Sequence, residues 1–367
     1  MNGKEKIVVE RFVYILIIAL LILSLFPLYT ILKSSASFGA WLEPVHSEES
    51  AEPDRSIPPV PEPSEAYAEL TLTFGGLCTP ASMLGSSAYG TFNAELAEKG
   101  AAYFFRDLTE YTQSDDFTLA GCSAVLSDRD DLTAVEKEKP EWYRAPSSAA
   151  EIFPAGGVDT VLLAGERLRD YGADGMEESK TALTDAGVRW GADGMAVTAE
   201  LREGIRLAVS CCELTGSEGE KESAAQDARS WIKGQRDGQN FLVIYVYDDE
   251  DNDTVSPLKE RILRSFIDAG ANLVIGSCGS TLQRAEEYGG GLIAYSLGTL
   301  LDGTAKYPEK YTALLQVHLK ANSGAIFETS WEWIPCRTYT ESASWSPAVL
   351  DGDDPEREQV LAILCGE

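Results

Sequence analysis

Histidine and basic side chains are scarce in this sequence. Only His46 and His318 occur among its 367 residues, so a zinc or iron site built on imidazole ligands would have almost nothing to use. Lysine and arginine together number 30, against 59 aspartates and glutamates, which gives a formal net charge of −29. Binding to nucleic acid requires a basic surface that neutralises phosphates. We therefore expect no nucleic-acid partner.

Closely spaced cysteine pairs are missing as well. The seven cysteines are dispersed and no C-x-x-C pair occurs, so a zinc ribbon or a thioredoxin-type motif is unsupported. The odd number leaves at least one thiol unpaired within the chain. Cys211 and Cys212 are adjacent, and we interpret them as small apolar residues of a buried strand rather than as a redox pair.

One long uncharged run lies near the N-terminus. Residues Phe12–Leu32 carry no charged side chain, and at a rise of 1.5 Å per residue the run would extend ~31 Å, the thickness of a bilayer's hydrocarbon core. Three basic residues precede the run and only Lys33 follows it directly, which places residues 1–11 in the cytoplasm. We predict that residues 12–32 form a signal anchor that crosses the cell membrane once, and that the rest of the chain, which follows it, is extracytoplasmic. Because small residues follow Lys33, cleavage of the chain after the apolar run is an alternative to a retained anchor.

The remaining chain divides by composition into three parts. Residues 33–67 are acidic and rich in proline, which is typical of an extended segment that buries too little apolar surface to fold. We interpret them as a tether that holds a globular body, residues 68–337, away from the membrane. Residues 338–367 are expected to form an irregular acidic tail with a short final helix.

Within the globular body, β-rich runs alternate with runs of helical periodicity. The expected strands are Glu69–Phe74, Asp116–Ala120, Val158–Ala164, Ile205–Ser210, Phe241–Tyr247 and Asn272–Gly276. The expected helices are Phe92–Tyr111, Met176–Ala186, Ser223–Lys233 and Pro257–Ala269. This alternation predicts an α/β fold with a largely parallel sheet, and the successive strands after Leu292 predict a meander that forms a second sheet. Ligands of such folds lie at the carboxyl ends of the strands.

Two runs of the sequence carry a family resemblance. AGANLVIGSCGSTLQRAEEYGGGLIAYSLGTLLDG, residues Ala269–Gly303, is similar to a motif "AGAD…IG-x-H-x-H…I-x-YSLGN", with Thr299 in place of the final asparagine. GGVDTVLLAGERLRDYGADGMEESKTALTDAGVRWGA, residues Gly156–Ala192, resembles "GFDVVSLANNH-x-x-D-x-G" and the run that follows it. From about Glu69 to Pro335, the chain thus resembles the CapA family of capsule (poly-γ-glutamate) synthesis proteins. The resemblance implies a layered α/β/β/α sandwich like that of the calcineurin-like metallophosphoesterases.

The positions at which this family carries its metal ligands hold other residues here. The replaced positions are Gly76, Gly121, Ser123, Gly165, Arg167, Tyr247, Cys278 and Ser280. Two divalent ions about 3.5–4 Å apart need several oxygen or imidazole ligands, whereas glycine offers none and Arg167 puts a cation where a metal would sit. We therefore predict a vestigial pocket that contains neither catalytic residues nor a metal. Its predicted residues are Gly76, Gly121, Ser123, Glu166, Arg167, Asp170, Tyr247, Asp248, Cys278 and Ser280. Arg167 is expected to pair with Asp170, or else with Glu166 or a ligand phosphate.

The resemblance implies a role in the synthesis of poly-γ-glutamate or another cell-surface polymer. With its ligand positions replaced, the chain is predicted to be a non-catalytic scaffold or regulator that contacts polymer synthase or export proteins. A first alternative is an active hydrolase that binds Mg²⁺, Mn²⁺ or Ca²⁺ at a relocated site. The carboxylates available for it are Glu166, Asp170, Asp248, Asp249 and Asp268. A second alternative is an extracellular module that recognises a glycan or peptide through Trp331, Trp333 and Trp345.

Overall fold

The structure is a computed structural model in which Ser64–Glu367 forms one compact unit. It describes residues 67–86, 90–138, 141–235, 241–250, 252–278, 280–305, 308–340 and 344–367, with Cys278 described by its backbone alone. The predicted anchor and the tether up to residue 66 lie outside these ranges. Within them, no helix is long and apolar enough to cross a membrane.

The first large sheet is mixed and has the strand order β17-β16-β15-β1-β3-β6-β7, with β14 beside the end of β1. Its strands are β1 (Ala68–Thr79), β3 (Phe117–Cys122), β6 (Thr160–Leu163), β7 (Arg189–Ala192), β14 (Thr299–Asp302), β15 (Tyr311–Asn322), β16 (Ala325–Arg337) and β17 (Ala348–Val349). Strands β1, β3, β6 and β7 run parallel, whereas β15 is antiparallel to β1. The carboxyl ends of four parallel strands therefore lie at one edge of this sheet.

The second large sheet has the order β12-β13-β11-β10-β9-β8 and is parallel from β13 to β9. Its strands are β8 (Val197–Glu200), β9 (Arg206–Leu214), β10 (Phe241–Asp248), β11 (Leu273–Cys278), β12 (Ala285–Tyr288) and β13 (Gly291–Ala294). Three short strands, β2 (Ser82–Met83), β4 (Val125–Leu126) and β5 (Tyr143–Ala145), form a small third sheet.

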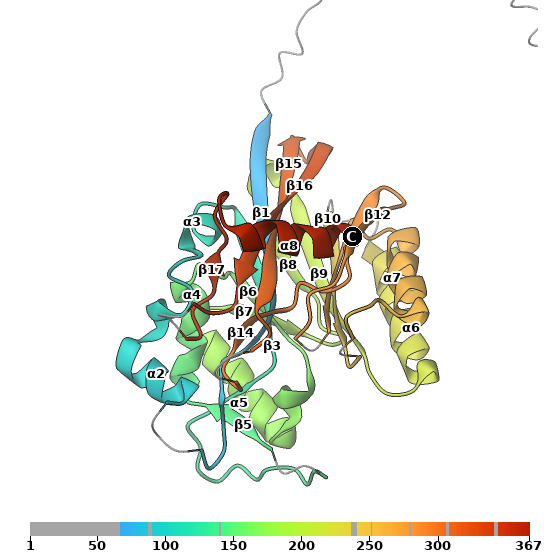
Figure 1. The fold of residues 1–367 in the computed structure, drawn as a ribbon. Helices are drawn as coiled ribbons and strands as arrows, with labels where there is room; N and C mark the ends of the chain where they lie inside the picture. Colours follow the sequence, from blue (N-terminus) through green and yellow to red (C-terminus); the bar gives the residue numbers. More distant parts are fainter. Residues whose placement is uncertain are drawn as a thin grey trace, which may run out of the picture. The chain divides into compact units, whose positions relative to one another are not determined.

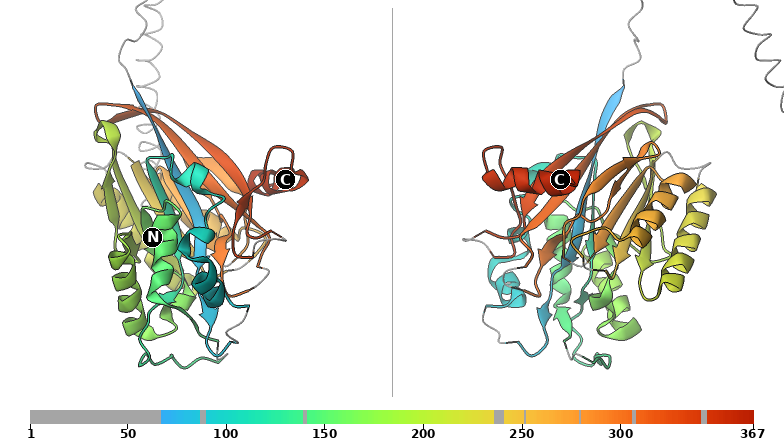
Figure 2. Two further views of the ribbon diagram at one scale, coloured as in Figure 1. Left: turned by 90° about the vertical axis from the view of Figure 1, so that its left-hand side faces the viewer. Right: turned by 45° about the vertical axis from the view of Figure 1, so that its right-hand side comes forward.

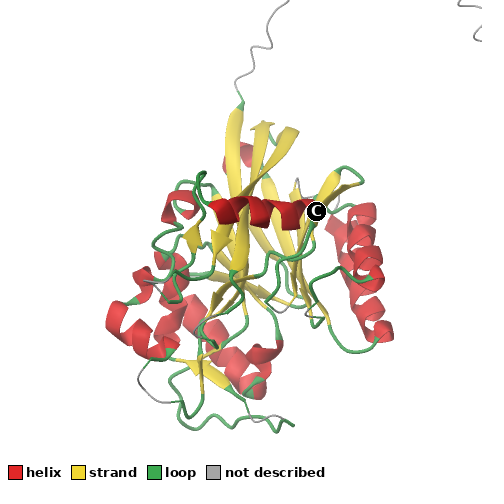
Figure 3. Ribbon diagram, viewed as in Figure 1, coloured by secondary structure: helices red, strands yellow, loops and turns green. Residues whose placement is uncertain are grey.

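Helices cover the outer faces of the two large sheets (Figures 1 and 3). The α-helices are α2 (Phe92–Lys99), α3 (Thr109–Thr112), α4 (Ile152–Ala155), α5 (Gly172–Asp185), α6 (Glu218–Gln235), α7 (Pro257–Ala269) and α8 (Pro355–Cys365). Helices α6 and α7 pack on the second sheet, and α2 to α5 lie on the side of the first, as the two views of Figure 2 also show. Helix α7 shows how the sequence determines where a helix begins and ends. Ser256 caps its first turn, Pro257 follows at the first helical position, and Gly270 ends it.

Three apolar clusters match these layers. One cluster lies between the sheets and includes Phe74, Leu119 and Tyr245, all buried. A second joins the first sheet to its helices, and a third joins the second sheet to α6 and α7 through Ile232 and Phe266. The order helix, sheet, sheet, helix agrees with the layered α/β architecture expected from the sequence.

Two expectations for the fold are wrong. The strands after Leu292 do not form a sheet of their own: β13 pairs in parallel with β11, while β15 and β16 extend the first sheet beside β1. This follows from alternating apolar side chains in β1 and β15, which are buried on the same inner face. The expected helix Phe92–Tyr111 is interrupted, because Gly100 adopts a positive φ of 77° and ends α2.

The acidic segment at residues 338–367 packs against the globular body. Strand β17 pairs with β16, and α8 lies across β15, β16 and β12 (Figure 1). Val360 and Leu364 of α8 are buried against Ala313 and Leu282. The C-terminal segment is thus part of the fold, and Glu356 at the start of α8 forms ion pairs with Lys310 and Arg337 of the globular body.

Candidate functional site

The carboxyl ends of β1, β3, β6 and β10 meet at a cavity of about 230 Å³, which we call the strand-end cavity. The residues that line it are Leu77, Thr79, Ser123, Glu166, Arg167, Tyr247, Ser280, Thr299, Asp302 and Thr304. Five of these were predicted from the sequence: Ser123, Glu166, Arg167, Tyr247 and Ser280. The two sheets contribute side chains to the same cavity, as the rule for parallel strand ends predicts.

Gly76 and Gly121 do not face this cavity, which corrects the prediction that they mark lost ligand positions. A Cβ atom on Gly76 would lie 2.0 Å from the carbonyl oxygen of Gly298, and one on Gly121 would lie 2.2 Å from the Tyr245 hydroxyl. Both glycines therefore allow a close approach of neighbouring chain segments. On β1, Leu77 and Thr79 line the cavity, and the Leu77 N–H donates to the Gly298 carbonyl at 3.2 Å.

A tight turn at the end of β6 places the charged residues of the cavity. Gly165 has a φ of 103°, which favours glycine, and a Cβ there would lie 2.4 Å from Ser123 Oγ. The Gly165 N–H donates to Glu213 Oε1 at 2.9 Å, and Glu213 also forms an ion pair with Arg169. The short 3₁₀ turn Glu166–Arg169 follows directly and brings Arg167 to the cavity.

Arg167 is held on both sides by groups of this chain. Its guanidinium lies over the Tyr143 ring, 4.2 Å from the ring centre, and its Nε is 3.4 Å from Glu166 Oε1. The expected pair with Asp170 is absent from the described ion pairs, while the alternative pair with Glu166 is present. Because the Glu166 side chain is 69% exposed, this ion pair is screened by water and holds Arg167 only loosely.

The other titratable groups of the cavity are shifted toward their neutral forms. Burial raises the pKa of Asp302, although hydrogen bonds from the Thr304 hydroxyl (2.6 Å) and N–H (2.8 Å) and the charge of Arg167 lower it in part. Burial raises the pKa of Tyr247 to about 12, so its phenol stays neutral at physiological pH. The cavity therefore offers hydroxyl groups and a guanidinium, with few charged oxygens.

Asp170 and Asp248 lie elsewhere, contrary to the prediction. Asp170 is fully buried, accepts the Tyr143 N–H at 2.6 Å and forms an ion pair with Lys137. It holds the segment before β5 against the end of the 3₁₀ turn. Its charge is satisfied within the fold, so Asp170 has a structural role.

Asp248 faces the helices behind the second sheet. Its carboxylate lies 3.1 Å from Lys221 Nζ of α6 and 3.4 Å from Lys259 Nζ of α7, and it accepts the Glu250 N–H at 3.1 Å. All three charged side chains are at most 5% exposed. We call Asp248, Lys221 and Lys259 the buried ionic cluster. Lys221 also pairs with Asp249 and Glu250, at 2.7 and 2.9 Å, so the charges of the cluster are compensated by these neighbours. They are not available to a ligand in the strand-end cavity.

The carboxylates considered for a relocated metal site do not gather. Asp249 pairs with Lys221 at 2.7 Å, and Asp268 lies 3.4 Å from the Tyr288 hydroxyl. Across the described residues, no group of three or more histidine, cysteine, aspartate or glutamate side chains is placed to hold a metal ion. The side chain of Cys278, the remaining predicted pocket residue, lies outside what the structure describes.

The tryptophans considered for glycan binding are not among the lining residues of the strand-end cavity. Trp331 donates through Nε1 to Glu287 at 2.9 Å, and Trp333 packs against the core from β16. Trp345 is buried and donates to the carbonyl oxygen of Ala305 at 2.7 Å. These contacts give each side chain a role in packing.

Sequence reasoning missed half of the cavity wall. The missed residues are Leu77, Thr79, Thr299, Asp302 and Thr304. A signal existed for Thr299, which follows the YSLG motif and replaces its asparagine, and for Leu77, which is one residue beyond the glycine that was singled out. Asp302 and Thr304 lie past the recognisable motif, and their place depends on the pairing of β14 with β1.

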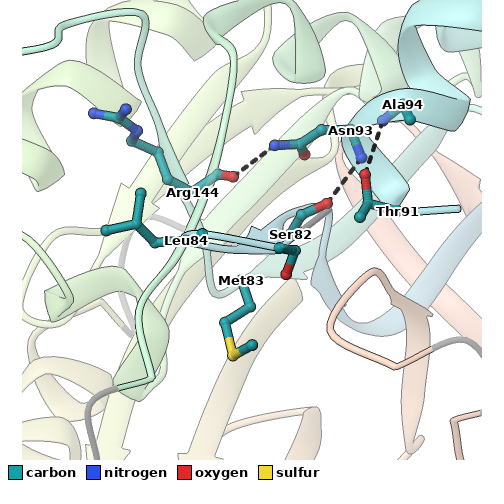
Figure 4. A pocket seen from close by; sticks show the side chains of 9 residues that line it. Ser82, Met83, Leu84, Thr91, Asn93, Ala94 and Arg144 are labelled. Carbon is teal, nitrogen blue, oxygen red and sulfur yellow. Dashed lines mark hydrogen bonds between the residues drawn. The ribbon is translucent and has the colours of Figure 1, made fainter. Parts of the chain in front are cut away.

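A larger cavity, of about 390 Å³, lies between α2, β2 and β5 (Figure 4). Its polar side chains bind the chain itself: the Asn93 N–H donates to Ser82 Oγ at 2.9 Å, and Asn93 Nδ2 donates to the Arg144 carbonyl oxygen at 2.9 Å. The Ala94 N–H donates to Thr91 Oγ1 as a helix cap. These hydrogen bonds, drawn in Figure 4, attach α2 to the small sheet and indicate a structural contact.

Comparison with known proteins relates the sequence of this chain to capsule synthesis proteins. Residues 78–304 match the model of a family described as "Bacterial capsule synthesis protein PGA_cap". The capsule biosynthesis protein CapA of Bacillus anthracis is 24% identical over an alignment of 267 residues, and the match covers 67% of this chain and 65% of that protein. The PGA biosynthesis protein CapA of Bacillus subtilis strain 168 is 33% identical over 84 residues, 23% of this chain and 21% of that protein. The matches thus span less than two thirds of either relative.

Solved structures show weaker likeness. A hypothetical protein from Thermus thermophilus aligns with a TM-score of 0.42 and 12% identity, over 72% of this chain and 99% of that one. A phosphatase from Mycoplasma pneumoniae aligns with a TM-score of 0.43 and 8% identity, over 80% of this chain and 98% of that one.

Proposed function

The chain belongs to the PGA_cap family of bacterial capsule synthesis proteins, and from this premise we propose that it acts in the assembly of a cell-surface polymer as a non-catalytic scaffold or regulator. Poly-γ-glutamate is the polymer that the relatives suggest. The proposal includes a membrane anchor at residues 12–32 and contact of the extracytoplasmic body with polymer synthase or export proteins.

This proposal rests on the side chains that the strand-end cavity offers as possible metal ligands. A phosphoesterase-like fold implies two metal ions, but the ends of β1, β3 and β10 present Leu77, Ser123 and Tyr247 to the cavity. Two carboxylates line the cavity, Glu166 and Asp302. The Arg167 guanidinium lies beside Glu166, and burial raises the pKa of Asp302. These residues do not fit a binuclear centre, because a fixed cation repels metal ions and neutral hydroxyls are poor ligands for them.

The cavity also lacks, among the described residues, the paired nucleophile and base that metal-free catalysis would need. An activated hydroxyl needs a base within hydrogen-bonding distance, and the described wall contains no histidine. His318 lies on β15, where its Nδ1 is 3.1 Å from Thr71 Oγ1. Among the described residues, the Ser123 hydroxyl forms no hydrogen bond to an imidazole or to either carboxylate of the wall, Glu166 or Asp302, so no base is in place to activate it.

The proposal is tested on the full chain purified in detergent. After incubation with Mn²⁺, Mg²⁺ or Ca²⁺ and removal of free ions, we expect elemental analysis to find far less than one ion per chain. We expect no hydrolysis of p-nitrophenyl phosphate or a γ-glutamyl oligomer above that of an Arg167→Gln variant. Stoichiometric metal together with turnover would show that the chain is a hydrolase.

A cellular experiment tests the scaffold role separately. Cells that lack the chain are complemented with the wild type, with Arg167→Gln, or with a form lacking residues 12–32. We expect Arg167→Gln to restore polymer output fully and the unanchored form to restore little of it. Loss of output with a folded Arg167→Gln protein would contradict a role that is independent of the cavity.

A further inference from the structure

A separate cavity of about 500 Å³ lies behind the second sheet, between α6, β9 and the turn that joins β7 to β8. We call it the hairpin–helix cavity. Helix α6 packs against β9, and the turn supplies Asp193, whose backbone pairs with Cys211 of β9. Its volume is within the usual range of small-molecule sites. The strand-end cavity shares none of its lining residues.

Three carboxylates line this cavity, and none of them forms an ion pair among the described residues. Glu220 accepts hydrogen bonds from the Ser217 N–H and hydroxyl, at 2.8 and 2.6 Å. Asp227 of α6 forms no hydrogen bond or ion pair within the described part of the chain, and Asp193 accepts only the Glu213 N–H, at 3.2 Å. Arg169 and Arg229 form ion pairs with other carboxylates, Glu213 and Glu222 respectively. Burial raises the pKa of Asp193, Arg169 lowers it, and the charge of Asp227 raises it again. The two carboxylates therefore repel one another across the cavity.

The floor and one wall carry further features of a binding site. Ser210 is only 5% exposed and lines the cavity, and its hydroxyl has no hydrogen-bond partner among the described residues. Its neighbours on the same face of β9, Ala208 and Cys212, pack against α6 and α7. Trp231 is half-buried and lines the cavity from α6. The Ser210 hydroxyl is open to the space of the cavity, where a donor or acceptor supplied by a ligand can pair with it.

From this arrangement we propose that the hairpin–helix cavity binds an alkylammonium group. The ammonium has three donors, which Asp193, Asp227 and the Ser210 hydroxyl can accept. The face of Trp231 adds a cation–π contact, and Ala228 beside it offers an apolar wall to methylene groups. A bare metal ion fits poorly, because no three ligand side chains converge anywhere in the described chain.

Two sources of this chemistry exist: a free aliphatic amine and a lysine side chain of a partner protein. Calorimetric titration of the full chain in detergent, at low ionic strength, distinguishes them. One arm uses 1,5-diaminopentane and the other a tripeptide with a central lysine and blocked termini. We expect saturable one-to-one binding in at least one arm, and the tighter of the two identifies the source. Absence of saturable binding in both arms would overturn the proposal.

Variants assign the binding to this cavity. We expect Asp227→Asn and Asp193→Asn each to weaken binding about tenfold, because each removes a charge-assisted hydrogen bond. Trp231→Leu should weaken it about threefold. Asp185→Asn, an exposed change of equal charge on α5, should leave it within about twofold of the wild type, a margin that allows for the altered net charge.

A matching loss in Asp185→Asn, or equal competition by Mg²⁺ at the same ionic strength, would show general attraction to an acidic protein and would overturn the proposal. Circular dichroism of each variant separates loss of binding from loss of fold. Because Asp193 lies on a turn and Asp227 on a helix, at least one substitution is expected to leave the fold intact.

Discussion

Tyr247 and Asp248 are neighbours at the end of β10, yet they belong to two different environments. Tyr247 points between the sheets and lines the strand-end cavity, where the described groups are mostly hydroxyls. Asp248 points toward the helices and joins the buried ionic cluster with Lys221 and Lys259. The alternation of side chains along a strand separates them, since successive residues face opposite sides of a sheet. Position at a strand end therefore does not by itself make a residue part of a site.

The two environments differ in how charge is stabilised. In the buried ionic cluster, each charge has an opposite charge within 3.4 Å and is shielded from water, so removal of Asp248 leaves Lys259 without an opposite charge. In the strand-end cavity, Asp302 is held by the Thr304 hydroxyl and N–H, and Arg167 by a largely exposed glutamate. The first environment is expected to contribute to stability, and the second is open to a ligand.

The largest effect is expected from Asp248→Asn. The substitution leaves Lys259 with Gln283 as its only described partner, at 3.1 Å, and should destabilise the protein by about 3 kcal/mol. Urea unfolding measures the change. Asp302→Asn is the control, because its hydrogen bonds to Thr304 can persist, and it should cost less than about 1 kcal/mol. Equal effects of the two substitutions would remove the distinction between the environments.

A smaller effect is expected from Gly76→Ala, which tests whether Gly76 packs against the neighbouring chain instead of facing the cavity as Leu77 does. The added Cβ would lie 2.0 Å from the Gly298 carbonyl oxygen, so backbone must move, at a cost of about 2 kcal/mol. Gly219→Ala serves as the matched control. Nothing lies within 4 Å of its Cβ position in α6, and helix propensity favours alanine there. A Gly76→Ala protein as stable as the wild type would restore Gly76 as a vacated ligand position.

Much of the fold could be predicted from the sequence, because local patterns decide it. The strands β1, β9, β10 and β11 follow apolar runs, and α7 has its cap residues and its boundaries where Ser256, Pro257 and Gly270 predict them. The place of β15 was missed. Its apolar alternation shows that it is a strand, but the choice of β1 as its neighbour depends on contacts between residues far apart in the chain.

The candidate site was predictable in part for the same reason. Arg167 and Glu166 follow a strand directly, and the strand-end rule finds them. The roles of Asp170 and Asp248 were mistaken, because the sequence shows where an acidic residue lies but not which lysine it meets. The partners of Asp248 come from α6 and α7, at positions 27 and 11 residues away. Pairing of this kind is set by tertiary packing.

The smallest effect concerns Asp115, a partly buried carboxylate that has no lysine or arginine beside it. Burial raises its pKa to about 6, although hydrogen bonds from Thr118 and Thr73 lower it in part. The pKa of Asp115 is higher in the folded than in the unfolded state, so its protonated carboxyl favours the folded state. This contribution to the free energy of unfolding is present below pH 4 and is lost as the pH rises through 6. Asp115→Asn removes this titration.

We therefore expect Asp115→Asn to become more stable relative to the wild type between pH 4 and pH 7, by about 1 kcal/mol after allowance for solvent screening. Urea unfolding at several pH values measures the difference. Asp116→Asn should show the opposite slope: burial raises the pKa of Asp116, but hydrogen bonds from Arg202 and the Thr71 N–H lower it overall. The wild type should keep its advantage over Asp116→Asn at neutral pH and lose it only under acid. If both aspartates gave the same slope, the presence of a cationic partner would not be what separates stabilising carboxylates from costly ones in this protein.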